Sequence, residues 1–272
     1  MRPTALILPA VSAGAALALF ALERLRPART PVSGGRREVC NLFLGALCSG
    51  VIQVLEKPLC AALGRRAVAR RSGLAQRLPA PPLVRDAAAF LLLDYSMYGW
   101  HVLGHKVPAL WRLHLVHHVD LHLTATTALR FHMADMVVSL PWRAAQVRLI
   151  GASPRAFAVW QGFFFASVLF HHSNLRLPRR VEDALERVFT TPRMHAIHHR
   201  AQRRLTDSNW SSGISWWDRL HGTFRLDVAQ RGQPVGVKAY REHLGARPSI
   251  ALPFRPQRDA WEDSCAPAQA GA

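Results

Sequence analysis

The stretch that decides the fold is His101-Val-Leu-Gly-His105, followed by His114-Leu-Val-His117-His118 and, further along the chain, by His195-Ala-Ile-His198-His199. On an α-helix, residues three and four positions apart lie on one face, so each group can direct its imidazoles towards one place. Neutral imidazole is the commonest metal ligand in proteins. With 14 histidines among 272 residues, one HxxHH triple is expected only about 0.04 times by chance. The spacing therefore predicts helices that share a metal site.

The three groups hold more imidazoles than a single zinc site needs, since a catalytic zinc takes about three protein ligands. The number instead suits two metal ions, each with an open position for a small reactant. Imidazole binds iron, zinc and copper, so the spacing leaves the metal open. No group contains the glutamate of an HExxH motif, which argues against a zinc-dependent hydrolase with a carboxylate general base.

The composition indicates a membrane protein. Half of the residues are hydrophobic, although the chain carries 35 Lys and Arg and a net charge of +18. The basic residues flank apolar runs, which fits membrane topology and anionic head groups, whereas nucleic acid is not expected as a partner. The four cysteines form no CxxC pair and are interpreted as small buried hydrophobes.

Long apolar runs predict an all-α, integral membrane bundle of about four or five membrane helices or hairpins, with a cytosolic-face helical cap that carries the histidines. The runs are Thr4–Leu22, Val39–Leu55, Ala87–Trp100, Ala134–Ile150 and Ala156–Phe170. Gly151-Ala-Ser-Pro154 predicts a turn that joins the last two runs into a hairpin, and Arg65–Pro82 predicts a connecting loop. Val181–Thr190 predicts a short amphipathic helix along the interface.

The order of the runs places every histidine group on one side of the membrane, because the third run ends at His101 and the hairpin returns to the same face. By the positive-inside rule this side is cytoplasmic. The basic segment Arg65–Arg71 would then lie on the opposite side if the first two runs both span. Either the second run is re-entrant or the rule is broken, so the orientation of these two runs stays open. The Arg- and Ala-rich composition favours a bacterial inner membrane.

The chain is predicted to divide into N-terminal membrane helices with a basic loop (1–85), a histidine-bearing domain (86–225) and a polar C-terminal tail (226–272). Asp94 interrupts the third apolar run seven residues before His101, on the same helix face. An acid within a membrane helix usually faces a partner. Its carboxylate is expected to accept a hydrogen bond either from a ligand imidazole or from a basic side chain.

Further residues around the histidines carry a resemblance. The chain resembles the fatty acid hydroxylase superfamily, a membrane group that includes sterol desaturases, C-4 methylsterol oxidases and alkylglycerol monooxygenase. The resemblance covers about Asp94–Phe224 and rests on Leu110-Trp-Arg-Leu-His114-Leu-Val-His117-His118, Thr127-Ala-Leu-Arg-Phe-His132, Phe170-His-His-Ser-Asn174, Thr191-Pro-Arg-Met-His195-Ala-Ile-His198-His199, Asp207-Ser-Asn-Trp210 and Trp217-Asp-Arg-Leu-His-Gly-Thr223.

This resemblance implies a fatty acid hydroxylase-like catalytic domain over residues 86–225. It implies a non-haem di-iron centre of two Fe ions that uses O2 to hydroxylate or desaturate a C–H bond of a lipid, whether fatty acyl, sterol, hopanoid or carotenoid-like. No acid or base is assigned beyond the di-iron centre itself. Because the chain shows no flavin, haem or iron–sulfur motif, electrons are expected from a separate ferredoxin- or cytochrome b5-like protein. The basic face around Arg176–Arg204 could steer this donor or contact lipid head groups.

The resemblance also implies the site residues. The expected metal ligands are His101, His105, His114, His117, His118, His172, His195, His198 and His199, with His171 as the other candidate for the position given to His172. His132 is expected to be a ligand or a near neighbour. Asp94, Asp207 and Asn209 are expected to support the ligands through hydrogen bonds, although Asp207 could equally cap a loop.

Besides His221, which stands where the family commonly has a Phe, two positions depart from the family pattern. After the histidine of the Arg-x-His segment the family usually shows Pro and then Glu, where this chain has Met133 and Asp135. These departures favour the alternative interpretation, a non-catalytic membrane protein of the same fold that binds metal or has a structural role.

Overall fold

The computed structural model describes residues 4–30, 35–228, 234–259 and 261. Within these residues the chain is all-α, as predicted, and its extended segments form only isolated bridges. The elements are α1 (Thr4–Leu25), α2 (Gly35–Val51), η1 (Ile52–Glu56), α3 (Lys57–Ala69), α4 (Leu74–Arg77), α5 (Pro82–Lys106), α6 (Pro108–His118), η2 (Ala125–Leu129), α7 (Met133–Val138), α8 (Leu140–Ile150), α9 (Pro154–His172), α10 (Arg179–Leu185), α11 (Pro192–His198), α12 (Arg203–Thr206), α13 (Trp216–Leu220), α14 (Ala246–Ala251) and η3 (Leu252–Phe254).

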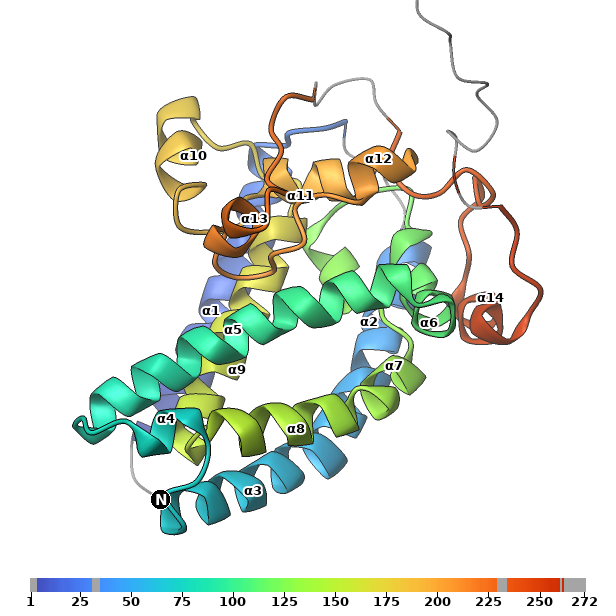
Figure 1. Ribbon diagram of the computed structural model, residues 1–272. Coiled ribbons are helices and arrows are strands. Elements are labelled where there is room, and N and C mark those ends of the chain that lie inside the picture. Colours follow the sequence, from blue (N-terminus) through green and yellow to red (C-terminus); the bar gives the residue numbers. More distant parts are fainter. Residues whose placement is uncertain (1–3, 31–34, 229–233, 260, 262–272) are drawn as a thin grey trace, which may run out of the picture.

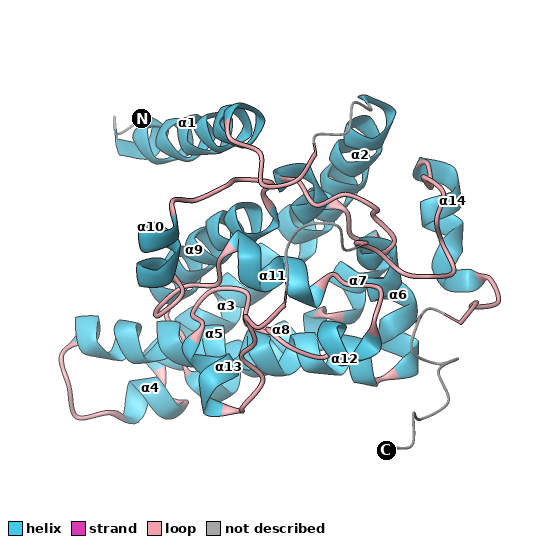
Figure 2. Ribbon diagram, turned by 90° about the horizontal axis from the view of Figure 1, so that it is seen from above, coloured by secondary structure: helices cyan, strands magenta, loops and turns pink. Residues whose placement is uncertain are grey.

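The long helices form a bundle with a cap of short helices at one end. Helix α5 packs against α9 and α6, while α3 packs against α8 and α9. Helices α10 to α13 lie above the end at which α9 finishes (Figure 1), and α11 packs directly on α9. Seen from above, α11 lies near the centre of the molecule (Figure 2). The cap therefore brings the last histidine group over the ends of the helices that carry the others.

Prolines set where the histidine-bearing helices begin. Pro108 removes a backbone donor and disfavours helical geometry for the residue before it. Val107 accordingly adopts φ −93° and ψ 115°, which separates α5 from α6. Pro192 opens α11, where the Thr191 hydroxyl accepts from the Met194 amide. The break at Val107 lets two consecutive helices meet at their histidines instead of continuing as one rod.

A continuous helix runs from α2 through η1 into α3, with η1 as a π-helical turn. The predicted loop Arg65–Pro82 was wrong in its first part, because α3 continues to Ala69 and α4 follows at Leu74. Alanine, leucine and arginine are strong helix formers, so the basic residues extend the helix rather than end it. The reversal comes at Gly73, whose φ of 88° is open to glycine but strained for other residues.

The turn of the predicted hairpin is confirmed. Gly151 has φ 76° and ends α8, and the Ser153 hydroxyl caps α9. The first half of the hairpin is two helices, α7 and α8, because Pro141 begins a new helix after Ser139. The core between α3, α5, α8 and α9 contains Cys60, Ala75, Ala89, Leu93, Met97, Val147, Ile150, Ala152, Ala156, Phe157 and Trp160.

A second core includes residues of the predicted polar C-terminal segment. Val237, Tyr240 and Leu252 are buried against Leu115 and Val116 of α6 and its neighbours. A few apolar residues at irregular spacing suffice to cover one helix face, so the polar average of this segment hid its packing. Residues 229–233, 260 and 262–272 of the predicted tail lie outside the described residues. The division of the chain at residues 85 and 225 stays a prediction.

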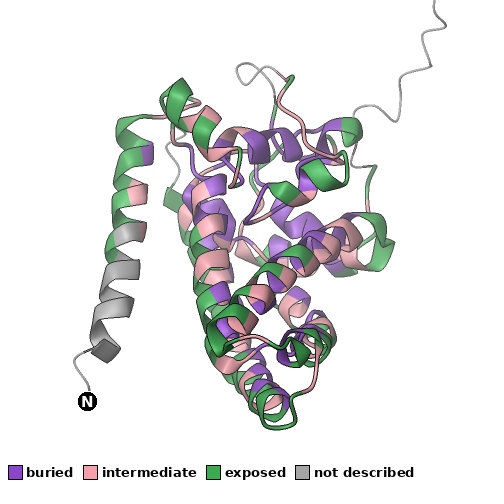
Figure 3. Ribbon diagram, turned by 60° about the vertical axis from the view of Figure 1, so that its left-hand side comes forward, coloured by how far each residue is buried: buried purple, intermediate pink, exposed green. Residues whose placement is uncertain are grey.

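One helical stretch of the described residues, Gly35–Arg77, is long and apolar enough to cross a membrane by length and composition, with a mean hydropathy of 1.7 over its most apolar window. The predicted number of membrane helices stays a prediction. Helix α1 runs along the side of the bundle (Figure 3). The predicted amphipathic helix Val181–Thr190 is shorter than expected, since α10 ends at Leu185.

Candidate metal centre

Nine buried histidines form two groups within the described residues. In each group the imidazole nitrogens that face one another all lie within 4.8 Å. The first histidine group is His101, His105, His114, His118 and His198, and the second histidine group is His117, His172, His195 and His199. These are the nine histidines that the resemblance implied, brought together from α5, α6, α9 and α11.

The two HxxHH motifs divide between the groups in the same way. In each motif the residues four positions apart share a group, and the residue between them belongs to the other group. His114 and His118 thus join the first group while His117 joins the second. The spacing predicted that the histidines of each motif share one helix face. In the structure, histidines at the two sides of that face belong to different histidine groups.

The second histidine group is the tighter one. The Nε2 atoms of His117 and His172 are 2.9 Å apart, as are those of His172 and His195, and the Nε2 atoms of His195 and His199 are 3.1 Å apart. Four Nε2 atoms therefore converge on one point, and a neutral imidazole carries only one N–H to offer at such a point.

Backbone carbonyls orient three of the rings. The Nδ1 atoms of His101, His172 and His198 donate to the carbonyls of Trp210, Val168 and Ser208 at 2.7, 2.7 and 3.0 Å. A hydrogen bond from one ring nitrogen fixes the tautomer and leaves the other nitrogen as a lone-pair donor for a metal. In each of these rings the free nitrogen is Nε2.

The remaining nitrogens of the first histidine group also support a metal. Buried polar atoms normally have a hydrogen-bond partner, yet both ring nitrogens of His105 and of His118, and Nε2 of His114 and of His198, have none among the described residues. A set made only of imidazoles fits iron, zinc or copper. The residues present thus fit a pair of such ions.

The electrostatics of the site favour neutral rings. Burial lowers the pKa of His118 and His199 well below the usual value, and repulsion from neighbouring histidines lowers it further. The same causes lower the pKa of His114 and His195. Uncharged imidazole is the form that binds a metal, so burial prepares the rings for that role.

Two other predicted histidines lie outside both groups. His132 accepts at Nδ1 from the Ala134 amide, and its Nε2 is 3.1 Å from the Ile250 carbonyl. The His171 ring packs on that of His195 with centroids 4.0 Å apart. Of the neighbours His171 and His172, only His172 belongs to a histidine group among the described residues.

The three polar residues expected behind the ligands have different surroundings. Asp94 accepts from the Ile214 amide and the Trp217 indole, and it therefore pins the cap to α5 rather than contacting an imidazole. Asp207 forms ion pairs with Lys106 and Arg203.

Asn209 fixes the backbone beneath α11. Its amide donates to the carbonyls of Met194 and Arg225 at 2.9 and 2.8 Å, and its oxygen accepts from the Arg225 amide at 2.8 Å. Its φ of 52° is a left-handed conformation that asparagine adopts more readily than most residues.

Sequence reasoning missed Asp218, although it lies in a quoted motif. Its carboxylate accepts from the amides of Trp210 and Ser211 at 2.7 and 3.0 Å and from the Thr223 hydroxyl at 2.7 Å. The Trp210 carbonyl in turn accepts from His101. Asp218 therefore holds the loop that orients a ring of the first histidine group.

We expect Asp218→Ala to weaken metal binding at the first histidine group by about 10- to 100-fold, as loss of a supporting hydrogen bond typically does. The measurement is metal content after dialysis against a graded chelator series. Asp227→Ala, at an exposed ion pair with Arg225, serves as the control. Unchanged metal retention by Asp218→Ala would contradict this role.

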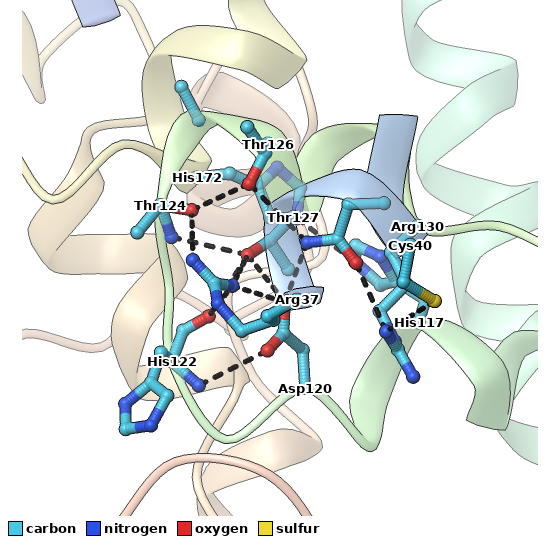
Figure 4. A network of polar contacts seen from close by, with 12 residues as sticks. Arg37, Cys40, His117, Asp120, His122, Thr124, Thr126, Thr127, Arg130 and His172 are labelled. Carbon is cyan, nitrogen blue, oxygen red and sulfur yellow. Dashed lines mark hydrogen bonds and ion pairs between the residues drawn. The ribbon is translucent and has the colours of Figure 1, made fainter. Parts of the chain in front are cut away.

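A polar network anchors the loop after α6 (Figure 4). Arg37 of α2 donates to Asp120 at 2.7 Å, and both side chains are buried. The same carboxylate oxygen accepts from Asn41 at 3.1 Å and from the Thr127 hydroxyl at 2.9 Å. The network lies beside His117 and His172 (Figure 4). It connects α2 to the segment that follows the His114–His118 motif of α6.

Two more buried charges extend this anchoring. Arg130 donates to the carbonyl of Val116, next to His117, and to the Asn41 side chain, both at 3.0 Å. Glu23 of α1 accepts from the amides of Ala125 and Asn174 at 2.9 Å each. No pattern in the sequence marks these contacts, because each joins residues far apart in the chain.

A cavity of about 910 Å³ opens beside the histidines. Six histidines are among its lining residues: His101, His114, His117, His171, His172 and His195. Its walls are mainly apolar, and α2, α5 and α9 supply Leu42, Met97, Trp100, Phe157, Trp160 and Phe164. Such a space suits a long apolar ligand with one part held against the metal positions.

The family profile described as fatty acid hydroxylase matches residues 87–223. This match includes every histidine of both groups. The chain belongs to the fatty acid hydroxylase family. No solved structure matches it.

Ornithine lipid hydroxylase OlsE of Rhizobium tropici is one of the curated relatives of this family member. The two are 28% identical over 187 residues, which are 62% of this chain and 55% of that protein. Alkylglycerol monooxygenase of Danio rerio is 32% identical over 138 residues, 50% of this chain and 29% of that protein. A cholesterol 25-hydroxylase-like protein of Danio rerio is 31% identical over 152 residues, 52% and 55% respectively. The chain spans about half or less of the length of these relatives.

Proposed function

We propose that this protein is a membrane-bound, non-haem di-iron oxidoreductase that uses O2 and external electrons to oxidise a C–H bond of a lipid. The observation that carries the proposal is that histidines of both groups line a large, mainly apolar cavity. Relatives whose names specify an ornithine lipid hydroxylase and an alkylglycerol monooxygenase support a lipid as the substrate.

In this proposal the first and second histidine groups each hold one iron. When bound, the iron pair supplies the activation of O2 that an unreactive C–H bond requires. The protein's own part is positioning. The carbonyls of Trp210, Val168 and Ser208 hold three rings in one tautomer, and the apolar walls exclude water while they align the chain of the substrate.

Hydroxylation of R–H consumes O2, two electrons and two protons and yields R–OH and water. Desaturation removes two hydrogens and yields two waters for the same two electrons and two protons. The electrons come from a separate donor protein, ferredoxin- or cytochrome b5-like, which docks on the cap side. Arg176, Arg179, Arg180, Arg187 and Arg193 give that side a positive field that favours an acidic donor.

The membrane part of the proposal rests on exposed apolar side chains. Leu42, Phe43, Val54, Leu55 and Leu59 are 37–71% exposed along α2, η1 and α3. A stripe of this kind on an otherwise folded helix is stabilised by lipid rather than by water. We place the protein as integral in a bacterial inner membrane, with the histidine groups at the cytoplasmic side.

The proposal is tested by growing cells that produce the protein under ¹⁸O2 and profiling their lipids. We expect one lipid class to gain a single ¹⁸O atom, or to lose two hydrogens if desaturation occurs, and purified protein to contain two irons by metal analysis and Mössbauer spectroscopy. Cells that produce His198→Ala are the control. Iron-loaded, reduced protein that leaves every lipid unchanged would favour a non-catalytic metal-binding role instead.

A further inference from the structure

The apolar cavity contains a second set of polar residues besides the histidines. We define the inner polar cluster as Glu56, Asp135, Arg143 and Gln161, all of which line the cavity. They come from four elements, η1, α7, α8 and α9. None of them belongs to either histidine group, so the metal centre does not account for their burial.

Part of the cluster is held in place by its own contacts. Gln161 donates to Oε1 of Glu56 at 2.8 Å, and Nε of Arg143 lies 3.6 Å from Oε2 of Glu56. Arg143 also donates to the Gln146 side chain at 3.2 Å, and its guanidinium lies over the Trp160 ring, 5.2 Å from the centroid. The side chains of Arg143 and Glu56 are only 11% and 4% exposed.

The π-helical turn η1 contributes to this arrangement. A single π turn within an α-helix changes which residues face a given side after it, and such turns are frequent at functional sites. Three residues of η1, Ile52, Gln53 and Glu56, line the cavity. The turn thus brings a carboxylate into a wall that is mainly apolar.

Other polar atoms of the cluster form no hydrogen bond with the described residues. Nε of Arg143 is buried without a hydrogen bond, and no hydrogen bond within the described residues uses its Nη2. The Asp135 carboxylate, on a residue that is 6% exposed, forms none with the described residues either. Since buried polar groups are normally hydrogen-bonded, both a donor and an acceptor are left for a molecule in the cavity.

The charges select what that molecule can offer. Glu56 already balances Arg143, so the cluster offers a carboxylate or phosphate no uncompensated positive charge. An ammonium group would lose its hydration in an apolar cavity with only one uncompensated carboxylate beside it. A purely apolar chain would leave Arg143 and Asp135 unpaired. A hydroxyl or amide both accepts and donates and meets neither penalty.

We propose that the inner polar cluster binds an uncharged hydroxyl or amide group of the lipid, with Arg143 donating to it and Asp135 accepting from it. This inference rests on the proposed function in one respect, namely that the bound lipid is the substrate. By holding one polar group at a fixed distance from the histidines, the cluster determines which carbon of the chain lies beside them.

The test measures binding without O2 or reductant, so it does not depend on turnover. The full-length protein in phosphatidylcholine nanodiscs is loaded with tritiated hexadecan-1-ol, and unlabelled competitors displace it. Competitors are hexadecan-1-ol, hexadecanamide, hexadecanoate, hexadecylamine and heptadecane, which replaces the hydroxyl by a methyl group. We expect the alcohol and the amide to compete about 10- to 100-fold better than heptadecane, as hydrogen bonds to charged groups imply.

Variants locate the effect. Asp135→Ala removes an acceptor that has no hydrogen-bond partner among the described residues, so folding should survive while the preference for alcohol over alkane falls at least several-fold. The pair Glu56→Gln with Arg143→Met removes both charges together and avoids a lone buried glutamate. Arg148→Met, at an exposed position of α8 outside the cavity, is the control and should keep the preference.

Equal competition by alcohol and alkane in the unmodified protein would overturn the inference, as would an unchanged preference in the folded Asp135→Ala variant. Stronger competition by hexadecanoate or hexadecylamine would overturn it too, because the cluster would then recognise charge. Failure of the proposed function is separate, since it appears as unchanged lipids under ¹⁸O2 in cells with the unmodified protein.

Discussion

Replacing His198 or His117 by alanine is expected to remove at least one iron and to reduce lipid oxidation to background. His198 belongs to the first histidine group and His117 to the second, and each is at most 1% exposed. Alanine offers no lone pair, so the group concerned loses one of its proposed ligands. Iron per chain by mass spectrometry and product formation in the same preparation check the result.

The two variants also test the division into groups. Because they affect different groups, their Mössbauer spectra should differ in which iron environment is lost. His243→Ala, at an exposed histidine outside both groups, should retain full iron and activity. Full activity in either His117→Ala or His198→Ala would exclude the ligand assignment.

Asp120→Ala is expected to destabilise the protein by about 3–5 kcal/mol, the usual effect of breaking a buried ion pair. The substitution leaves the Arg37 guanidinium buried, 5% exposed, without its charge partner, and Asn41 and Thr127 lose an acceptor. For a chain of this size that corresponds to a melting temperature lower by about 6–20 °C. Thermal unfolding in detergent, followed by circular dichroism, measures the shift.

Two comparisons show whether the unpaired charge is the cause. Arg37→Met combined with Asp120→Leu removes both charges and should be less harmful than Asp120→Ala alone. Asp183→Ala breaks the exposed Arg179–Asp183 pair of α10 and should change stability by less than about 0.5 kcal/mol. A melting temperature of Asp120→Ala equal to that of Asp183→Ala would show that the network adds little.

The helices that carry the histidines were predictable because periodicity is local. His101 and His105 indicate a helix by spacing alone, and Gly151 and Pro154 mark a turn by backbone chemistry. The choice between His171 and His172 was not predictable, since adjacent helical residues differ in direction by about 100° and only packing sets the rotation of α9. The division of each HxxHH motif between two groups depends on tertiary structure in the same way.

The contacts that stabilise the site were beyond a reading of the sequence. Arg37 and Asp120 are 83 positions apart, and each is an ordinary charged residue until the fold buries it. Asp94 was recognised as unusual because it interrupts an apolar run, but its partners, Ile214 and Trp217, belong to the cap. An acidic residue within an apolar run indicates that it needs a polar partner, but the sequence does not show which residue that partner is.

The shared use of α6 and α11 by both histidine groups has a consequence for how the protein matures. Each of these helices contributes rings to both positions, so an ion bound at one group would also fix the helices that carry rings of the other. The second ion then loses less conformational freedom on entry than the first did. Half-loaded protein should therefore be scarce at equilibrium, and the enzyme would pass from apo to fully loaded in nearly one step as iron becomes available.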